Sequence, residues 1–338
     1  MKNRANNQIK GIVFILVSAF FYGTYGIWSR LMAVSFGEFT QAWTRGLLLL
    51  IVILILNLKF KIFKKIERTN LPWFIIIALS GGLNQAPYFF GFKHLTIGTA
   101  TMLFYAALVI GGYLIGKLAF NEKITITKYI SLFLAIAGML VIYRLILTSD
   151  QILPASLTII AGLMGACAAV LPKKLSNQYS ELHIMSGYFI VMVVANSILG
   201  FIFHEKLPAF NQSTVWLAQI GYSAALLFAN LAVIEGFKHI EASIGSLIGL
   251  AEILFRISFG IIFFAESLTI GTIIGGGLII LSAALPNLLF AKSHKISLFP
   301  IHRRSGGAIL WTLLAGAEGV EPLSKVLETS ILPLNYAP

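Results

Sequence analysis

The chain has 338 residues, of which 58% are hydrophobic and only 11% are charged. Soluble domains carry about 25% charged residues, and a soluble fold of this length cannot cover so much apolar surface, so the composition excludes an ordinary soluble protein. The formal net charge of +12 does not indicate a nucleic-acid partner, because the basic residues lie between apolar segments, where they orient a membrane protein in the bilayer.

Ten apolar segments follow one another along the chain, each close to the roughly 20 residues that a membrane-spanning helix needs. They are 11–33, 39–57, 72–92, 97–119, 128–147, 155–172, 183–203, 214–236, 242–264 and 270–290. In lipid every backbone polar group must be satisfied within the segment. We therefore expect an all-α membrane protein of ten transmembrane helices.

The basic residues between the segments predict how the chain is oriented. If the N-terminus is cytoplasmic, the cytoplasmic side holds Lys2, Arg4, Lys10, Lys59, Lys61, Lys64, Lys65, Arg68, Lys117, Lys123, Lys128, Lys173, Lys174, Lys238, Lys292 and Lys295. The outer side then holds Arg30, Lys93, Arg144 and Lys206. This imbalance predicts a multi-pass protein of a bacterial inner membrane with both termini in the cytoplasm.

Residues 296–338 do not fit this pattern, because they contain no spanning run and no clean hydrophobic period. The segment resembles a spurious translation, of the kind that arises when a reading frame runs on into a structural RNA gene. An ordinary flexible tail is the alternative interpretation. Under either interpretation we assign these residues no function.

Two motifs occur twice at nearly the same spacing. The sequence GFKH at 91–94 recurs at 236–239, and FNEKITI at 120–126 recurs as FAESLTI at 264–270. The offsets are 145 and 144 residues. So long a period indicates a duplicated domain rather than a solenoid repeat.

The duplication divides the chain into a first five-helix repeat, residues 1–147, and a second, residues 148–295. Because five is an odd number, the second repeat enters the membrane from the opposite side. Inverted repeats are typical of secondary transporters, whose substrate sites lie near the midplane between the repeats.

This layout resembles the drug/metabolite transporter superfamily, in particular its ten-helix EamA-type permeases, over about residues 10–290. Glu122 and Glu266 are similar to the glutamate of that family's Gly-Glu step, with Asn121 and Ala265 in place of the glycine. The resemblance implies a permease for small molecules and leaves the substrate open.

Two further positions carry the resemblance. Glu252 resembles the glutamate of the family's Glu-Pro step in the ninth helix, although Ile253 replaces the proline. Arg45 resembles an arginine that is common in the second helix. The missing proline changes the expected kink, and with it the expected shape of the pocket.

Glu252 lies near the middle of the ninth predicted helix, and Arg256 follows four residues later on the same face. A charge at the bilayer centre costs about 2.5–3.5 kcal/mol on insertion scales, so something must offset it. Two interpretations are open. The pair forms a substrate or proton site that faces a cavity, or it is a structural ion pair that fixes this helix against its neighbours.

Uncharged polar residues give further candidates. Gln85 and Asn230 occupy equivalent positions of the two repeats, and Asn84 adjoins Gln85. Buried amides bind other helices or a substrate. Pro87 is expected to break the third helix, and such breaks often line cavities.

Other candidates carry a charge or an aromatic ring. Arg45 lies about two turns into the second helix, where an arginine snorkels, pairs with a carboxylate or binds an anion. The candidates for holding a planar or amphipathic substrate, with core or interfacial packing as the alternative, are Tyr22, Tyr25, Trp28, Tyr88 and Tyr105.

Three classes of function fit such a protein. A membrane enzyme acting on lipid needs nucleophiles or metal ligands at one depth, and the six histidines are scattered. A non-transporting scaffold or sensor subunit has no need of a midplane charge pair, but stays an alternative. We expect a secondary transporter that moves a small metabolite or drug-like molecule by alternating access, with no cofactor and a proton as the candidate coupling ion. The sequence does not indicate an oligomeric state.

Overall fold

The computed structural model describes residues 2–32, 35–143 and 147–293, and within these ranges the secondary structure is helical with no strand. Its elements are α1 (Lys2–Gly23), α2 (Tyr25–Met32), α3 (Glu38–Phe60), α4 (Leu71–Leu83), α5 (Gln85–His94), α6 (Ile97–Phe120), α7 (Ile126–Tyr143), η1 (Ser149–Gln151), α8 (Ile152–Val170), η2 (Leu171–Lys174), α9 (Glu181–Ile202), α10 (Ser213–His239), α11 (Ala242–Gly249), α12 (Ala251–Phe264) and α13 (Ile270–Ser293). The expected all-α fold is confirmed for these residues. The expectations for Arg144 and for the tail 296–338 fall outside them.

Eight helical runs in the described part of the chain are long and apolar enough to cross a membrane. Of the other two predicted segments, 72–92 is divided between α4 and α5, and 270–290 falls on α13. Many large apolar side chains face outwards; Phe133 is 71% exposed and Phe201 is 81% exposed. A lipid solvent accounts for such a surface, so the chain is a multi-pass membrane protein.

Three of the predicted spans are interrupted, at Thr24, Asn84 and Leu250. The break at Asn84 has the cause that the sequence predicts, because Pro87 has no N–H group to donate to the carbonyl four residues before it. At Thr24 the side-chain hydroxyl donates to the carbonyl of Phe21 at 2.6 Å, which competes with the helical backbone pattern. Because of each break, the two helical parts of a span can present different faces to the neighbouring helices.

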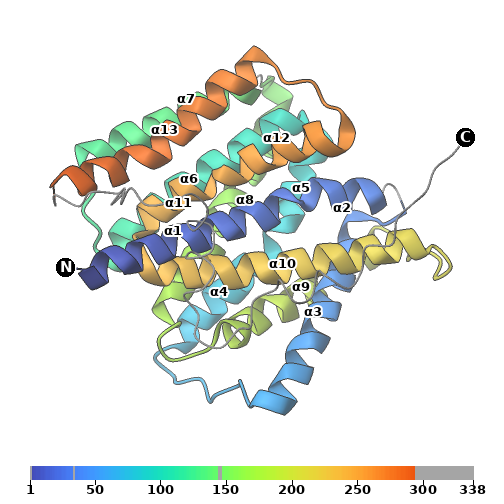
Figure 1. The fold of residues 1–338 in the computed structure, drawn as a ribbon. Coiled ribbons are helices and arrows are strands. Elements are labelled where there is room, and N and C mark those ends of the chain that lie inside the picture. The colour runs from blue at the N-terminus through green and yellow to red at the C-terminus, as the bar shows by residue number, and fades with distance from the viewer. Residues whose placement is uncertain (1, 33–34, 144–146, 294–338) are drawn as a thin grey trace, which may run out of the picture. The chain divides into compact units, whose positions relative to one another are not determined.

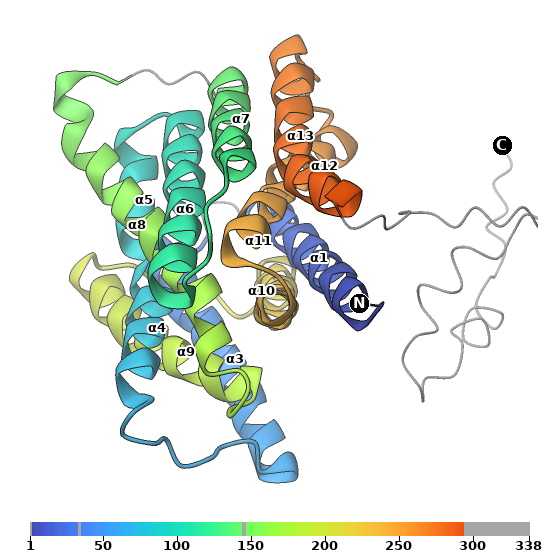
Figure 2. The same ribbon diagram turned by 90° about the vertical axis from the view of Figure 1, so that its left-hand side faces the viewer.

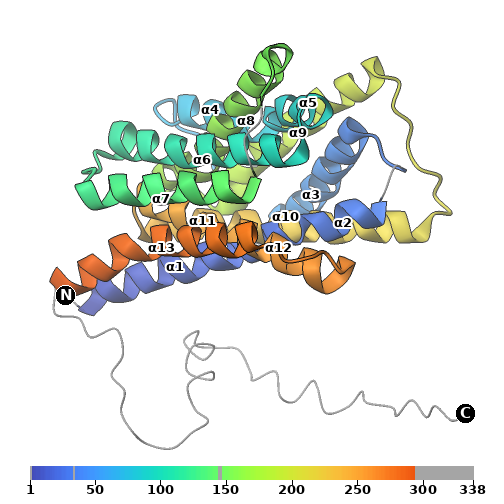
Figure 3. The same cartoon turned by 90° about the horizontal axis from the view of Figure 1, so that it is seen from above.

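The helices of the two halves interleave within the unit Met1–Phe290. Figure 1 shows α1 running along α10, and α6 packs along α8 while α3 and α4 pack along α9. The view from above shows α1, α12 and α13 on one side of the helices and α4, α5 and α8 on the other (Figure 3). Most of the interior therefore lies between the halves rather than within either half.

The last helices of the two halves, α7 and α13, lie side by side (Figures 1 and 2). Their backbones approach at Gly138 and Gly275, where a Cβ atom added to Gly138 would lie 2.7 Å from the carbonyl oxygen of Gly275. Small residues at such a crossing let two membrane helices pack backbone to backbone.

The helices α6 and α12 end in the same way. Asn121 and Ala265 follow them, each with φ of 52°, in the left-handed region. The next N–H groups, of Glu122 and Glu266, donate to the carbonyl six residues earlier, at 2.9 and 3.2 Å. At a helix end with a left-handed residue glycine is usual and asparagine is tolerated. Alanine at position 265 is therefore strained.

Replacing Ala265 with glycine is expected to raise the free energy of unfolding by about 1 kcal/mol, because glycine adopts positive φ without a steric penalty. Asn121→Gly should have a smaller effect. Ala119→Gly, inside α6, is the control and should destabilise by about 1 kcal/mol. Denaturation of the full chain in mixed micelles measures all three. A destabilising Ala265→Gly would contradict the strain.

Candidate functional site

A cavity of about 60 Å³ lies between the two halves of the chain. Its lining comes from α1, α6, α8, α10, α11 and α12. Three of the residues predicted for the site, Tyr22, Tyr105 and Glu252, are part of this lining. Most of the other lining side chains are apolar, and Glu252 is the one carboxylate among the described residues of the wall.

Glu252 is positioned by the break at Leu250, which puts it in the first turn of α12. A carboxylate is stabilised there by the exposed N–H groups of the helix start. The same oxygen, Oε1, accepts a hydrogen bond from the Tyr105 hydroxyl and lies 2.6 Å from Nη2 of Arg256. Arg256 Nη2 also donates to the Tyr105 hydroxyl, at 3.1 Å. The predicted pair thus exists, and Tyr105 joins it from the other half of the chain.

Tyr22 is held in the cavity wall by Asn230. The Tyr22 hydroxyl donates to Oδ1 of Asn230 at 3.0 Å, and Nδ2 of Asn230 donates to the carbonyl of Leu226 at 2.8 Å. The amide therefore uses an acceptor and a donor within the protein. Asn230 links α1 to α10 and fixes the direction of the Tyr22 side chain.

Gln85 is the counterpart of Asn230 in the first repeat. Its side-chain oxygen Oε1 is buried without a hydrogen-bond partner, whereas Oδ1 of Asn230 accepts from Tyr22. The Tyr88 hydroxyl is also buried without one, and the Tyr88 ring stacks on Phe104 with a centroid separation of 4.2 Å. Asn84 lies at the break between α4 and α5. None of the three predicted residues, Asn84, Gln85 or Tyr88, lines the cavity. The Tyr88 ring is connected to it through Phe104, whose ring contacts that of Tyr105.

Two other predicted residues, Trp28 and Arg45, lie further along the bundle. The Trp28 indole N–H donates to Thr24 at 3.0 Å, and its ring packs on Gly221 of α10. Arg45 is 1% exposed, so the snorkelling interpretation is wrong. Its Cζ atom lies 3.8 Å from the centre of the Tyr222 ring. Neither side chain lines the cavity.

The sequence did not single out several residues that the structure brings to this region. Phe237 and Ser246 line the cavity, and Tyr222 contacts Arg45. The repeated GFKH motif contains Phe237, so its second copy was an available signal. Nothing in the pattern distinguishes Tyr222 from other tyrosines, because only the packing of α3 on α10 brings it to Arg45.

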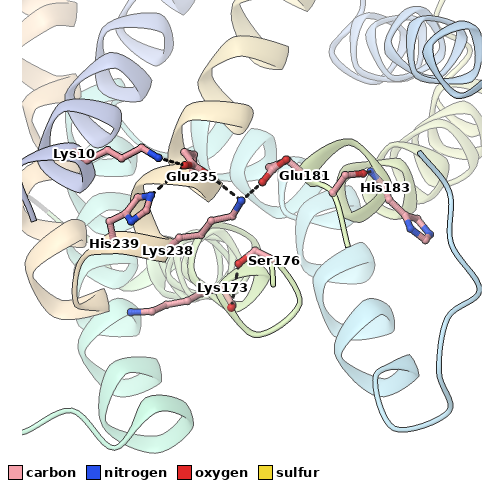
Figure 4. A network of polar contacts seen from close by, with 9 residues as sticks. Lys10, Lys173, Ser176, Glu181, His183, Glu235, Lys238 and His239 are labelled. Carbon is pink, nitrogen blue, oxygen red and sulfur yellow. Dashed lines mark hydrogen bonds and ion pairs between the residues drawn. The ribbon is translucent and has the colours of Figure 1, made fainter. Parts of the chain in front are cut away.

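A polar network joins α1, α9 and α10 at the end of the bundle that holds Lys10 (Figure 4). Glu235 lies 2.8 Å from Nζ of Lys10, 2.8 Å from Nζ of Lys238 and 3.1 Å from Nε2 of His239. Lys238 also pairs with Glu181. The second GFKH motif thus supplies two members, Lys238 and His239, of a network that ties three helices together.

A comparison with family models gives a match to the EamA-like transporter family twice, over residues 9–144 and 152–288. Together the two matches cover most of the chain, one in each half. The chain belongs to the EamA-like transporter family. None of the curated proteins matches it by sequence.

The EamA assignment agrees with the fold. A solved structure, described only as the crystal structure of a protein, superimposes with a TM-score of 0.72 at 13% identity. The match covers 84% of this chain and 98% of the other. At so low an identity the likeness concerns the fold alone.

Glu122 and Glu266, which occupy equivalent positions of the two repeats, have different partners in this structure. Glu122 caps α11, accepting from the N–H of Ala242 at 2.5 Å and from the N–H and hydroxyl of Ser243 at 3.2 and 2.9 Å. Glu266 pairs instead with Arg30, at a position where both side chains are about half exposed. Equivalent residues of the two repeats are therefore used differently.

Proposed function

We propose that this EamA-family protein is a secondary transporter that moves a small molecule across a bacterial inner membrane by alternating access. The observation that carries the proposal is the central cavity, which both halves line and whose wall holds the Glu252 carboxylate. A buried charge inside a membrane protein is costly, and ionisable residues at this depth usually line the path of a transported substrate or ion. The substrate is a small metabolite or drug-like molecule.

In this proposal Glu252, Arg256 and Tyr105 form the polar end of the site, and Tyr22 forms its aromatic wall. Asn230 positions Tyr22, while Gln85, Tyr88 and Asn84 supply further polar groups that become available when α5 moves. Glu252 is the candidate carrier of a coupling proton, since a carboxylate with a tyrosine donor and an arginine partner can exchange one. No cofactor is required.

The different partners of Glu122 and Glu266 support the alternating-access part of the proposal. Glu122 bridges from the loop after α6 to the start of α11, which holds one end of the bundle together. By the repeat offset, the start of α6 is the equivalent target for Glu266. We propose that this second cap forms when the first one breaks, so that one end closes as the other opens.

Contacts at the ends of the helices support the inverted arrangement. Lys93, from the first GFKH motif, pairs with Glu38 at 3.3 Å, at the start of α3 just after α2. Lys238, from the second, pairs with Glu181 and Glu235 at the end that holds Lys10. The two copies of the motif thus lie at opposite ends of α1 and α2.

Reporter fusions test the topology of ten spans with both termini inside. Fusions after Lys64 and Lys295 are expected to read cytoplasmic, and a fusion after Lys206 is expected to read external, because the basic residues follow that division. The inverted model is wrong if the reporters at 64 and 206 read on the same side.

Transport is tested in proteoliposomes with a mixed panel of labelled metabolites. The full chain is expected to exchange at least one labelled solute against its unlabelled form, whereas protein-free liposomes should not. Thermal stabilisation by the same panel identifies the solute first, because only a bound ligand raises the midpoint. Stable, correctly oriented protein that binds a solute but never exchanges it would favour the sensor or scaffold alternative.

A further inference from the structure

Arg45 is a buried cation without a counter-ion. It lies in α3 and is 1% exposed, and no carboxylate of the described residues is within the 4.0 Å of an ion pair. Its Nε and Nη1 atoms have no hydrogen-bond partner. Arginine stays charged in proteins, and a buried charge normally has a partner. The position of Arg45 therefore needs an explanation beyond packing.

The surroundings of Arg45 hold it in place without neutralising it. Gln219 of α10 donates to the carbonyl of Gln41 and to the hydroxyl of Thr44, both at 2.7 Å, and so fixes α3 against α10. The guanidinium lies over Tyr222, a cation–π contact that attracts the charge but leaves the N–H groups of Nε and Nη1 unused. The site is rigid and still has donors to offer.

A chain of aromatic rings connects Arg45 to the central cavity. The rings of Tyr222 and Tyr25 are 4.4 Å apart, and those of Tyr25 and Tyr22 are 5.3 Å apart, between their centroids. Tyr22 lines the cavity. The Tyr25 hydroxyl is buried and has no hydrogen-bond partner. A second unused donor thus lies between Arg45 and the cavity.

The charges of this region do not balance. Arg256 neutralises Glu252 at 2.6 Å, which leaves Arg45 as one uncompensated positive charge. A carboxylate carries one negative charge and would cancel it. A phosphate monoester carries about −1.5 to −2 at neutral pH and would reverse the sign.

We propose that Arg45 and Tyr25 form an anion-binding subsite and that the transported molecule is a monocarboxylate with an apolar remainder. The carboxylate accepts hydrogen bonds from the guanidinium and the Tyr25 hydroxyl. The remainder extends past Tyr22 into the cavity, against Val233 and Phe237. This inference names the substrate class of the transport site proposed above and rests on that function.

The test uses the purified full chain in detergent and straight-chain carboxylates from acetate to octanoate. Amides and amines of the same chain lengths serve as the neutral and cationic controls. Alkyl phosphates of the same lengths test whether a doubly charged anion binds as well. At least one carboxylate is expected to raise the thermal midpoint of the wild type in a saturable way, with its amide and amine inactive. The inference fails if no carboxylate stabilises, or if amides, amines or phosphates stabilise as much.

Variants separate a ligand-binding role of Arg45 from a structural one. Arg45→Gln should weaken the apparent affinity for the carboxylate at least tenfold without lowering the midpoint of the unliganded protein, because it removes an unpaired buried charge. Arg45→Lys should bind with intermediate affinity, since it keeps the charge and loses the planar donor array. Arg30→Gln, which changes an exposed and paired arginine, is the matched control and should bind normally. An unchanged carboxylate response in Arg45→Gln would overturn the inference.

Tyr25→Phe provides a second variant that keeps the ring and removes the unused hydroxyl. It should weaken carboxylate binding severalfold, and an unchanged affinity would remove Tyr25 from the subsite. Exchange in proteoliposomes separates the two proposals. Exchange of only neutral or cationic solutes would overturn the monocarboxylate inference and keep the transporter. Arg45-dependent carboxylate binding without exchange of any solute would keep the anion-binding subsite and overturn the transport function.

Discussion

The Glu252→Gln protein is expected to insert and fold but to lose at least tenfold in transport rate. The side chain keeps its size and can still accept from Tyr105 and Arg256, so the local packing survives. Glutamine cannot hold or release a proton and cannot neutralise Arg256, which would then add a second uncompensated cation to the site. Uptake into proteoliposomes, normalised to folded protein, measures the loss. Any residual uptake should no longer vary with pH in the range where the wild type does.

A double change distinguishes this functional role from a purely structural ion pair. With Glu252→Leu and Arg256→Leu together, a structural pair would be replaced by apolar packing at little cost, and activity would persist. We expect folded and inactive protein instead. The pair of Glu38 and Lys93 at the end of the bundle is the matched control, and Glu38→Gln with Lys93→Gln should leave transport near wild type. Full activity of the double leucine protein would remove Glu252 and Arg256 from the mechanism.

Much of the fold could be predicted from local sequence, and the reasons are physical. Lipid requires long apolar runs, so hydropathy found each segment that became a helix or a broken helix. The repeat appeared because whole motifs were duplicated. The helix breaks were only partly predictable. Pro87 predicts the break at Asn84 because proline lacks an N–H group, but no proline lies near the breaks at Thr24 and Leu250.

The candidate site was harder to predict, because its contacts join residues far apart in the chain. Glu252 and Arg256 could be paired from helical spacing alone. Their contact with Tyr105 spans more than a hundred residues and depends on how α6 packs near α12. The unpaired state of Arg45 is a property of everything around it. A sequence shows that a charge is present but not which partners are missing.

Glu122→Gln is expected to open the end of the bundle that Glu122 now closes. The carboxylate accepts three hydrogen bonds from Ala242 and Ser243 at the start of α11, where the helix dipole favours a negative charge. Glutamine keeps one acceptor oxygen and loses the charge. If this costs about 1–2 kcal/mol, the equilibrium between the two arrangements shifts roughly 5–30-fold towards the open one.

Accessibility of the cavity from that end measures the shift. Cys167 is first replaced by serine, because it is the only cysteine in the sequence, and Ser246 in the cavity wall is changed to cysteine. A membrane-impermeant maleimide added to inside-out vesicles should then label the Glu122→Gln protein several times faster than its parent. Glu266→Gln is the matched control, since Glu266 pairs with Arg30 near the surface and caps no helix in this arrangement. It should not speed labelling from this side and should slow it, because loss of the second cap favours the arrangement in which Glu122 holds this end closed. Equal labelling rates in the two glutamine variants would mean that the repeat-related glutamates do not alternate, and the exchange of caps between α11 and α6 would have to be abandoned.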